Sequence, residues 1–167
     1  MSANVVVAHA GPLHYLILID CADILGNLFN QVLVPFAVRD ELLHPNAPQK
    51  VKDWIRKAPP WIEITTVAKV QPVHGLHRGE AETLQLALER KAAAVLMDDM
   101  DGRAAARQLG LVPIFTVALL EHGAEKGLVE LASAIARLQQ TSFFISKEIL
   151  DAAFERDRLG KEKAKQK

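Results

Sequence analysis

Three carboxylates crowd the chain at Asp98, Asp99 and Asp101, directly after the apolar run 92–97. A short apolar run bounded by charge is typical of a buried strand. Carboxylates this close repel one another, and a cation among them relieves the repulsion. Ligands of α/β proteins also bind at the carboxyl ends of strands. The pattern therefore indicates a divalent-metal site, and the alternative is an acidic turn that caps the next helix.

Other candidate ligands follow earlier predicted strands or begin a nearby helix. His9 comes directly after the apolar run 4–8, and Glu41 lies in the helix after the second predicted strand. Glu80 and Glu82 lie in the first turn of the helix that leads into the acidic strand. Strand tips of a parallel sheet meet at one edge, so we expect these side chains to converge there. Such an oxygen-rich set suits Mg²⁺ or Mn²⁺.

Each of these residues also has a purely structural interpretation. Glu80 and Glu82 can stabilise the positive end of a helix dipole. Glu41 can face solvent on an otherwise apolar helix. His9 can be a residue with a satisfied ring at a helix start, and Asp101 can be the N-cap of the helix that follows it.

Strands alternate with helices along the chain, which predicts an α/β fold whose parallel sheet is covered on both faces. The predicted strands cover residues 4–8, 31–34, 61–65, 92–97 and 112–115. The alternating strand 61–65 is expected at an edge of the sheet. The predicted helices cover residues 12–19, 22–29, 35–44, 49–57, 80–91, 102–109, 116–126, 128–139 and 146–158.

Length and composition indicate one domain over residues 1–159, followed by a basic tail. The chain has 167 residues, half of them apolar, which suffices for the core of one domain. Residues 160–167 carry four lysines and are expected to be disordered. The 20 basic and 20 acidic residues do not point to a strongly basic nucleic-acid binder, and they do not exclude a local basic groove.

The predicted location is the cytoplasm. A single cysteine, Cys21, excludes an intramolecular disulfide and fits a reducing compartment. The first residues lack a signal-peptide pattern, and no apolar run approaches the length of a membrane span. We therefore expect no membrane partner.

Four pieces of the sequence, in this order, resemble a PIN domain of the branch related to VapC-type toxins. These pieces are residues 5–13, 32–42, 78–82 and 98–103. The last two are also similar to the Glu-Ala-Glu and Glu-Asp-Met-Asp stretches of flap endonucleases, which have a related nuclease fold. The resemblance implies a three-layer α/β/α fold with a central parallel sheet of four or five strands. It also implies a metal-dependent ribonuclease with an acidic pocket.

The resemblance assigns catalytic roles to Glu41, Glu82 and Asp99. Its full metal-site set is His9, Glu41, Glu80, Glu82, Asp98, Asp99 and Asp101. In this set Glu41 matches the family's second acid, Glu80 or Glu82 the third, and Asp99 best matches the fourth. His9 occupies the position of the family's first Asp, which binds the metal directly. Imidazole is a poor ligand for Mg²⁺, so His9 shifts the expected preference toward Mn²⁺ or another transition metal.

These expectations combine into a PIN-type endoribonuclease that depends on Mg²⁺ or Mn²⁺ and is the toxin of a toxin–antitoxin pair. The ions would activate a water that attacks the phosphodiester. Arg103 and Arg78 are predicted to contact the nucleic acid, while an exposed polar helix face is the alternative for Arg103. The expected partners are RNA, a small antitoxin protein and a second copy of the chain.

His9 also motivates a rival from another functional class. Without the first acid, the chain would be a catalytically degenerate PIN domain that binds RNA or a protein partner without cleavage. A metal-dependent phosphatase acting on small substrates is a third hypothesis, which the family resemblance disfavours.

Overall fold

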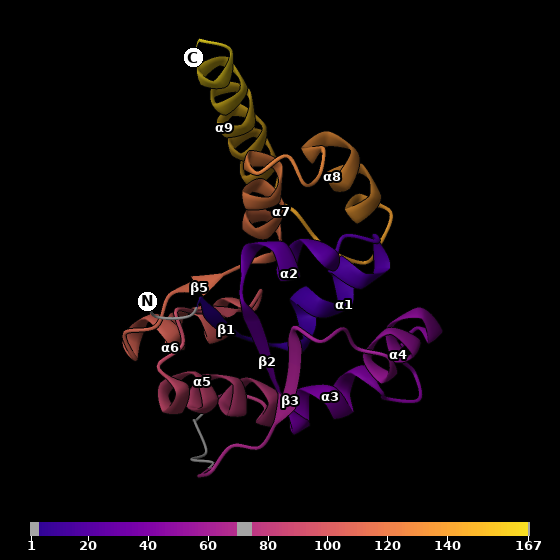
Figure 1. Ribbon diagram of the computed structural model, residues 1–167, viewed down its shortest axis with the longest axis vertical. Helices are drawn as coiled ribbons and strands as arrows, with labels where there is room; N and C mark the ends of the chain where they lie inside the picture. Colours follow the sequence, from indigo (N-terminus) through magenta and orange to yellow (C-terminus); the bar gives the residue numbers. More distant parts are fainter. Residues whose placement is uncertain (1–3, 70–74, 167) are drawn as a thin grey trace.

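The computed structural model describes residues 4–69 and 75–166, which form a five-stranded parallel sheet between layers of helices (Figure 1). The strand order is β3-β2-β1-β4-β5. The strands are β1 (Val5–Ala8), β2 (Gln31–Pro35), β3 (Ile62–Thr65), β4 (Ala94–Leu96) and β5 (Pro113–Ile114). In the register, Val6 of β1 is paired with Val32 of β2 on one side and with Ala94 of β4 on the other. The predicted α/β fold is confirmed, with five strands.

The central strand β1 is apolar on both faces because helices cover both faces of the sheet. Val6 and Ala8 belong to one core layer, and Val7 belongs to the other. Central strands of parallel sheets are buried on both sides and therefore read as continuous apolar runs. β3, which alternates in sequence, lies at an edge of the sheet as predicted.

The helices divide between the two faces of the sheet. α5 (Arg78–Arg90) and α6 (Met100–Gln108) pack on the Val7 face, through Leu84, Leu86 and Ala106. The Val6 face is covered by α1 (Ala10–Leu18), α2 (Asp23–Leu28), α3 (Phe36–Leu42), α4 (Gln49–Arg56), α7 (Thr116–Glu125) and α8 (Leu131–Gln139). Within residues 4–69 and 75–166, no helix is both long and apolar enough to cross a membrane.

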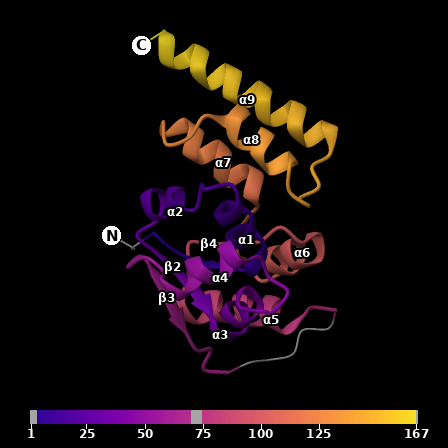
Figure 2. The same ribbon diagram turned by 90° about the vertical axis from the view of Figure 1, so that its right-hand side faces the viewer.

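The last helix, α9 (Lys147–Lys165), packs against α7 and α8 and projects away from the sheet (Figure 2). The predicted disorder of 160–167 is therefore wrong for residues 160–165, and Lys167 lies outside the described residues. Ion pairs between residues four apart extend the helix, Arg158 with Glu162 and Asp157 with Lys161.

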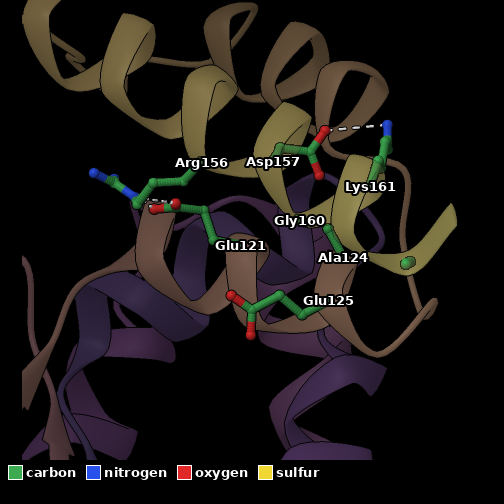
Figure 3. A pocket seen from close by; sticks show the side chains of 8 residues that line it. Glu121, Ala124, Glu125, Arg156, Asp157, Gly160 and Lys161 are labelled. Carbon is green, nitrogen blue, oxygen red and sulfur yellow. Dashed lines mark hydrogen bonds and ion pairs between the residues drawn. The ribbon is translucent and has the colours of Figure 1, made fainter. Parts of the chain in front are cut away.

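A cleft runs between α7 and α9 (Figure 3). Its walls carry the ion pair of Arg156 with Glu121, in which Nε and Oε1 are 2.6 Å apart, and that of Asp157 with Lys161. Its other lining residues belong to the same two helices, so the cleft is separate from the predicted site residues.

Two helices begin two residues earlier than predicted because acidic side chains cap them. Glu80 accepts a hydrogen bond from the backbone N–H of His77, so α5 begins at Arg78. Asp99 accepts from the backbone N–H of Gly102 and is the N-cap of α6. The alternative in which Asp101 caps this helix is therefore wrong.

Candidate active site

His9 and Asp98 come just after the neighbouring strands β1 and β4, where the strand order of the parallel sheet changes direction. α1 leaves β1 toward one face, and α6 leaves the neighbouring strand β4 toward the other. Ligands of open α/β sheets bind in the crevice between such strands, beyond their carboxyl ends. Here the backbone N–H of His9 donates to the carbonyl of Leu96 over 2.9 Å and joins the two strand tips.

His9 has a buried ring nitrogen without a hydrogen-bond partner among the described residues. Its side chain is 14% exposed, and its buried Nε2 has no hydrogen-bond partner within residues 4–69 and 75–166. The nearest paired carboxylate oxygen, Oε2 of Glu41, lies 3.8 Å away, which is too long for a hydrogen bond. Burial lowers the pKa of His9 to about 4, although the charge of Asp99 acts in the opposite direction. The imidazole is therefore neutral at pH 7, the form that binds metal ions.

Glu41 approaches His9 from the last turn of α3 and is 42% exposed. Its pKa is raised, first by partial burial and then by the negative charge of Glu80, with a smaller effect of Glu82. The negative charges of Glu80 and Glu82 thus act on Glu41.

Gly79, in the first turn of α5, leaves the space that Glu41 occupies. A Cβ atom at this position would overlap Oε1 of Glu41 and would lie 3.4 Å from Nε2 of His9. Residues of α3, α5 and the β1–α1 junction thus meet around a position that has no side chain. Sequence reasoning missed Gly79, because the glycine is informative only through neighbours nearly 40 and 70 positions away in the chain.

The two other glutamates are buried and bonded within α5. Glu80 accepts from the His77 backbone over 3.1 Å, and Oε2 of Glu82 accepts from Nε of Arg78 over 2.8 Å. The Arg78 side chain is 79% exposed, so it remains accessible from solvent. Both glutamates thus contribute negative charge near Glu41 while they also hold the start of the helix.

Asp98 connects β4 to α7 through Thr116, the first residue of α7. Its Oδ1 accepts from the backbone N–H of Thr116 over 2.8 Å, and its Oδ2 accepts from the hydroxyl over 2.7 Å. Burial raises the pKa of Asp98, while these hydrogen bonds and the nearby Arg103 act against the shift. Thr116 was also missed, although its place directly after the last predicted strand could have indicated it.

Asp99 and Asp101 are exposed at the start of α6, the helix that follows β4. Asp99 uses Oδ2 to accept from Gly102 over 2.9 Å, and its charge acts on His9. Arg103, one turn further on, has its guanidinium carbon 5.1 Å from the centre of the Phe115 ring. Its buried Nε has no hydrogen-bond partner among the described residues. The positively charged guanidinium of Arg103 therefore lies near Asp98, at the edge of the candidate site.

The residues present fit a divalent ion held by few protein ligands. In the described part of the chain, no group of three or more His, Cys, Asp or Glu side chains is arranged to hold a metal. His9 and Glu41, however, offer an unpartnered nitrogen and a carboxylate 3.8 Å apart. Mg²⁺-type sites often use only one or two protein ligands and complete their coordination with water and substrate phosphates. The predicted ligand roles of Glu80, Glu82, Asp98, Asp99 and Asp101 remain predictions.

Comparison with known proteins defines the class to which this fold and site belong. A family model, DUF3368, described as a PIN domain, matches residues 5–158. The chain therefore belongs to the PIN-domain family, which is generally a nuclease fold and usually uses divalent metals.

Solved structures contain the same fold. The chain is similar to a PilT N-terminus domain protein from the hyperthermophilic archaeon Sulfolobus solfataricus P2, with a TM-score of 0.52 and 17% identity. The match covers 85% of this chain and 99% of the archaeal one. No curated protein sequence matches the chain. The predicted family and fold are confirmed.

Proposed function

We propose that the chain is a divalent-metal-dependent endoribonuclease of the PIN type and the toxin of a toxin–antitoxin pair. One observation carries the proposal: Nε2 of His9 is buried, unpartnered among the described residues, and 3.8 Å from the Glu41 carboxylate. The pair lies at the sheet edge where α/β proteins bind their ligands. A neutral imidazole and a carboxylate together are a suitable ligand pair for a divalent cation.

The surrounding residues have complementary roles in this proposal. A divalent ion, when bound, supplies an activated water and neutralises charge on the phosphodiester. His9 and Glu41 would hold it, while the negative charges of Glu80 and Glu82 would make their surroundings attractive to cations. Arg103 lies at the edge, where its guanidinium can bind a phosphate oxygen of RNA. Glu82 and Asp99 are proposed as further catalytic carboxylates.

Cleavage of single-stranded RNA in the presence of Mn²⁺ or Mg²⁺, with and without chelator, tests the mechanism. We expect cleavage that chelator abolishes and that Glu41→Gln strongly reduces. Glu148→Gln, an exposed change in the first turn of α9, is the matched control and should leave the rate unchanged. Cleavage that persists in chelator would contradict the proposal.

A second candidate is a degenerate PIN domain that binds RNA or a protein partner without cutting it. It is favoured by the bonding of four acidic side chains to protein partners: Glu80 to the His77 backbone, Glu82 to Arg78, Asp98 to Thr116 and Asp99 to the Gly102 backbone. The variant His9→Asp separates the two candidates. If the variant cleaves RNA and the natural chain does not, the degenerate domain is correct; equal activity of both counts against it.

The toxin role also predicts partners. A small antitoxin would insert a basic side chain into the acidic crevice, and a second copy of the chain would form a homodimer. Expression should arrest bacterial growth, and Glu41→Gln should relieve the arrest. Growth unaffected by a chain that cleaves RNA in vitro would remove the toxin role and leave the ribonuclease. Sedimentation of the purified chain tests the dimer.

A further inference from the structure

Gly79 lies in a helix, and its backbone angles are ones that any residue can adopt. It lies in the first turn of α5, and its φ is not in the left-handed region. Glycine in a helix is less favourable than alanine because its backbone loses more entropy on folding. The reason for glycine here is therefore steric, and it concerns what lies next to the α-carbon.

The steric reason is the carboxylate of Glu41. A Cβ at position 79 would overlap Oε1 of Glu41 and would lie 3.0 Å from its Cδ. The same Cβ would lie 3.4 Å from Nε2 of His9. The carboxylate of Glu41 thus fills the space that a side chain at position 79 would take, and Nε2 of His9 borders that space. Glu41 can lie there only while residue 79 is glycine.

The nitrogen of His9 and the carboxylate of Glu41 together favour one class of cation. Nε2 of His9 is a nitrogen donor, and Mg²⁺ prefers oxygen donors in a near-ideal octahedron. Imidazole together with a carboxylate suits Mn²⁺ and the later first-row metals, whose affinity for nitrogen ligands rises along the series. The donors therefore discriminate between the two classes of ion.

We propose that Gly79 is a positioning residue that keeps Glu41 beside His9, and that the resulting half-site selects a transition-metal ion over Mg²⁺. The inference rests on the proposed metal-dependent function and specifies its cofactor. Because it concerns binding, it can be tested without RNA cleavage.

The first experiment measures metal binding to the full chain by calorimetry, with Co²⁺, Mn²⁺ and Mg²⁺ as separate probes. The visible spectrum of bound Co²⁺ reports nitrogen ligation independently. We expect Co²⁺ and Mn²⁺ to bind at least tenfold more tightly than Mg²⁺. Gly79→Ala should weaken Co²⁺ binding about 10- to 100-fold, the usual effect of removing the support of a metal ligand.

Gly160→Ala is the matched control, since a Cβ at this position of α9 meets no atom within 4 Å. It should leave Co²⁺ affinity unchanged. Adding Glu41→Asp to Gly79→Ala withdraws the carboxylate from the new methyl group and should restore part of the affinity. Rescue of this kind distinguishes positioning from general destabilisation. Unchanged Co²⁺ affinity in Gly79→Ala would overturn the role of Gly79.

A second variant keeps the metal selectivity testable if Gly79→Ala does not fold. His9→Asp replaces the nitrogen donor with a carboxylate and should bring Mg²⁺ affinity up to that of Mn²⁺, with loss of the nitrogen-ligated Co²⁺ spectrum. Equal affinities for Mg²⁺ and Mn²⁺ in the natural chain would overturn the inference. Selective metal binding without RNA cleavage would instead refute the nuclease and leave the inference intact.

Discussion

Nε2 of His9 faces Oε2 of Glu41 across 3.8 Å, and no hydrogen bond joins them among the described residues. The two atoms belong to the β1–α1 junction and to α3, and the missing side chain of Gly79 leaves the space that the Glu41 carboxylate occupies. The imidazole is buried and neutral at pH 7, so it does not form a salt bridge with the carboxylate there. The proposed metal site rests on this pair of one nitrogen and one carboxylate.

The metal-free protein should lose stability in mild acid because of His9. Its folded pKa of about 4 lies below the ordinary histidine value of 6.5, so the unfolded chain binds more protons between these values. The contribution of neutral His9 to the free energy of unfolding is fully present above pH 6.5. It is lost as the pH falls toward 4, by about 3 kcal/mol in total. Urea unfolding in chelator from pH 7.5 to 4.5 measures it. A His9→Gln variant should show a shallower dependence on pH, and an identical slope would contradict the assignment.

Two substitutions of Asp99 should separate its role as a helix cap from its charge. Asp99→Asn keeps an oxygen that accepts from Gly102, so we expect little change in the free energy of unfolding. Asp99→Ala removes the cap and should cost about 1 kcal/mol. Both variants remove a negative charge near His9 and should weaken divalent-cation binding to a similar extent. Equal stability of the two variants would show that the cap contributes nothing.

Asp98 and Thr116 should be energetically coupled. Asp98→Ala leaves the N–H and hydroxyl of the fully buried Thr116 without their carboxylate and should destabilise the fold by about 1–3 kcal/mol. Thr116→Val removes only the hydroxyl and should cost about 1 kcal/mol. In a double-mutant cycle measured by urea unfolding, the two losses should not add, because the side chains share a hydrogen bond. Simple additivity would refute the coupling.

Gly26 should tolerate no side chain, because α2 packs closely on a tryptophan. A Cβ at this position would lie 2.5 Å from Nε1 of Trp61, part of a rigid ring that also packs against Trp54. Gly26→Ala should therefore destabilise the protein by about 1–3 kcal/mol. Gly160→Ala, which meets open space in α9, should be neutral or stabilising by up to about 1 kcal/mol. Thermal unfolding of both variants compares them, and a neutral Gly26→Ala would contradict this packing.

Much of the fold was predictable because burial leaves a direct trace in the sequence. β1 is covered by helices on both faces, so its residues are uniformly apolar, whereas the edge strand β3 alternates. The α9 extension was missed, because a lysine-rich segment resembles a disordered tail unless its acidic partners one turn away are considered.

The sequence could suggest the acidic residues of the candidate site, whose roles remain predictions, but it did not suggest their neighbours Thr116 and Gly79. Residues that follow strands can be assigned to one sheet edge, which was sufficient to select His9, Asp98 and Asp99. Thr116 and Gly79 act through residues distant in the chain. The place of Thr116 after the last predicted strand is a local signal for it, whereas neither local composition nor spacing assigns a role to Gly79.

Residue types and their order along the chain are enough to establish an α/β fold and a set of carboxylates at the tips of its strands. Which of these carboxylates bond to the protein, and that the His9 nitrogen has no partner among the described residues, depends on tertiary packing. The physical reason is that hydrogen bonding and desolvation act over a few ångströms. Such short distances arise only when α3, α5 and the tips of β1 and β4 meet in the folded chain.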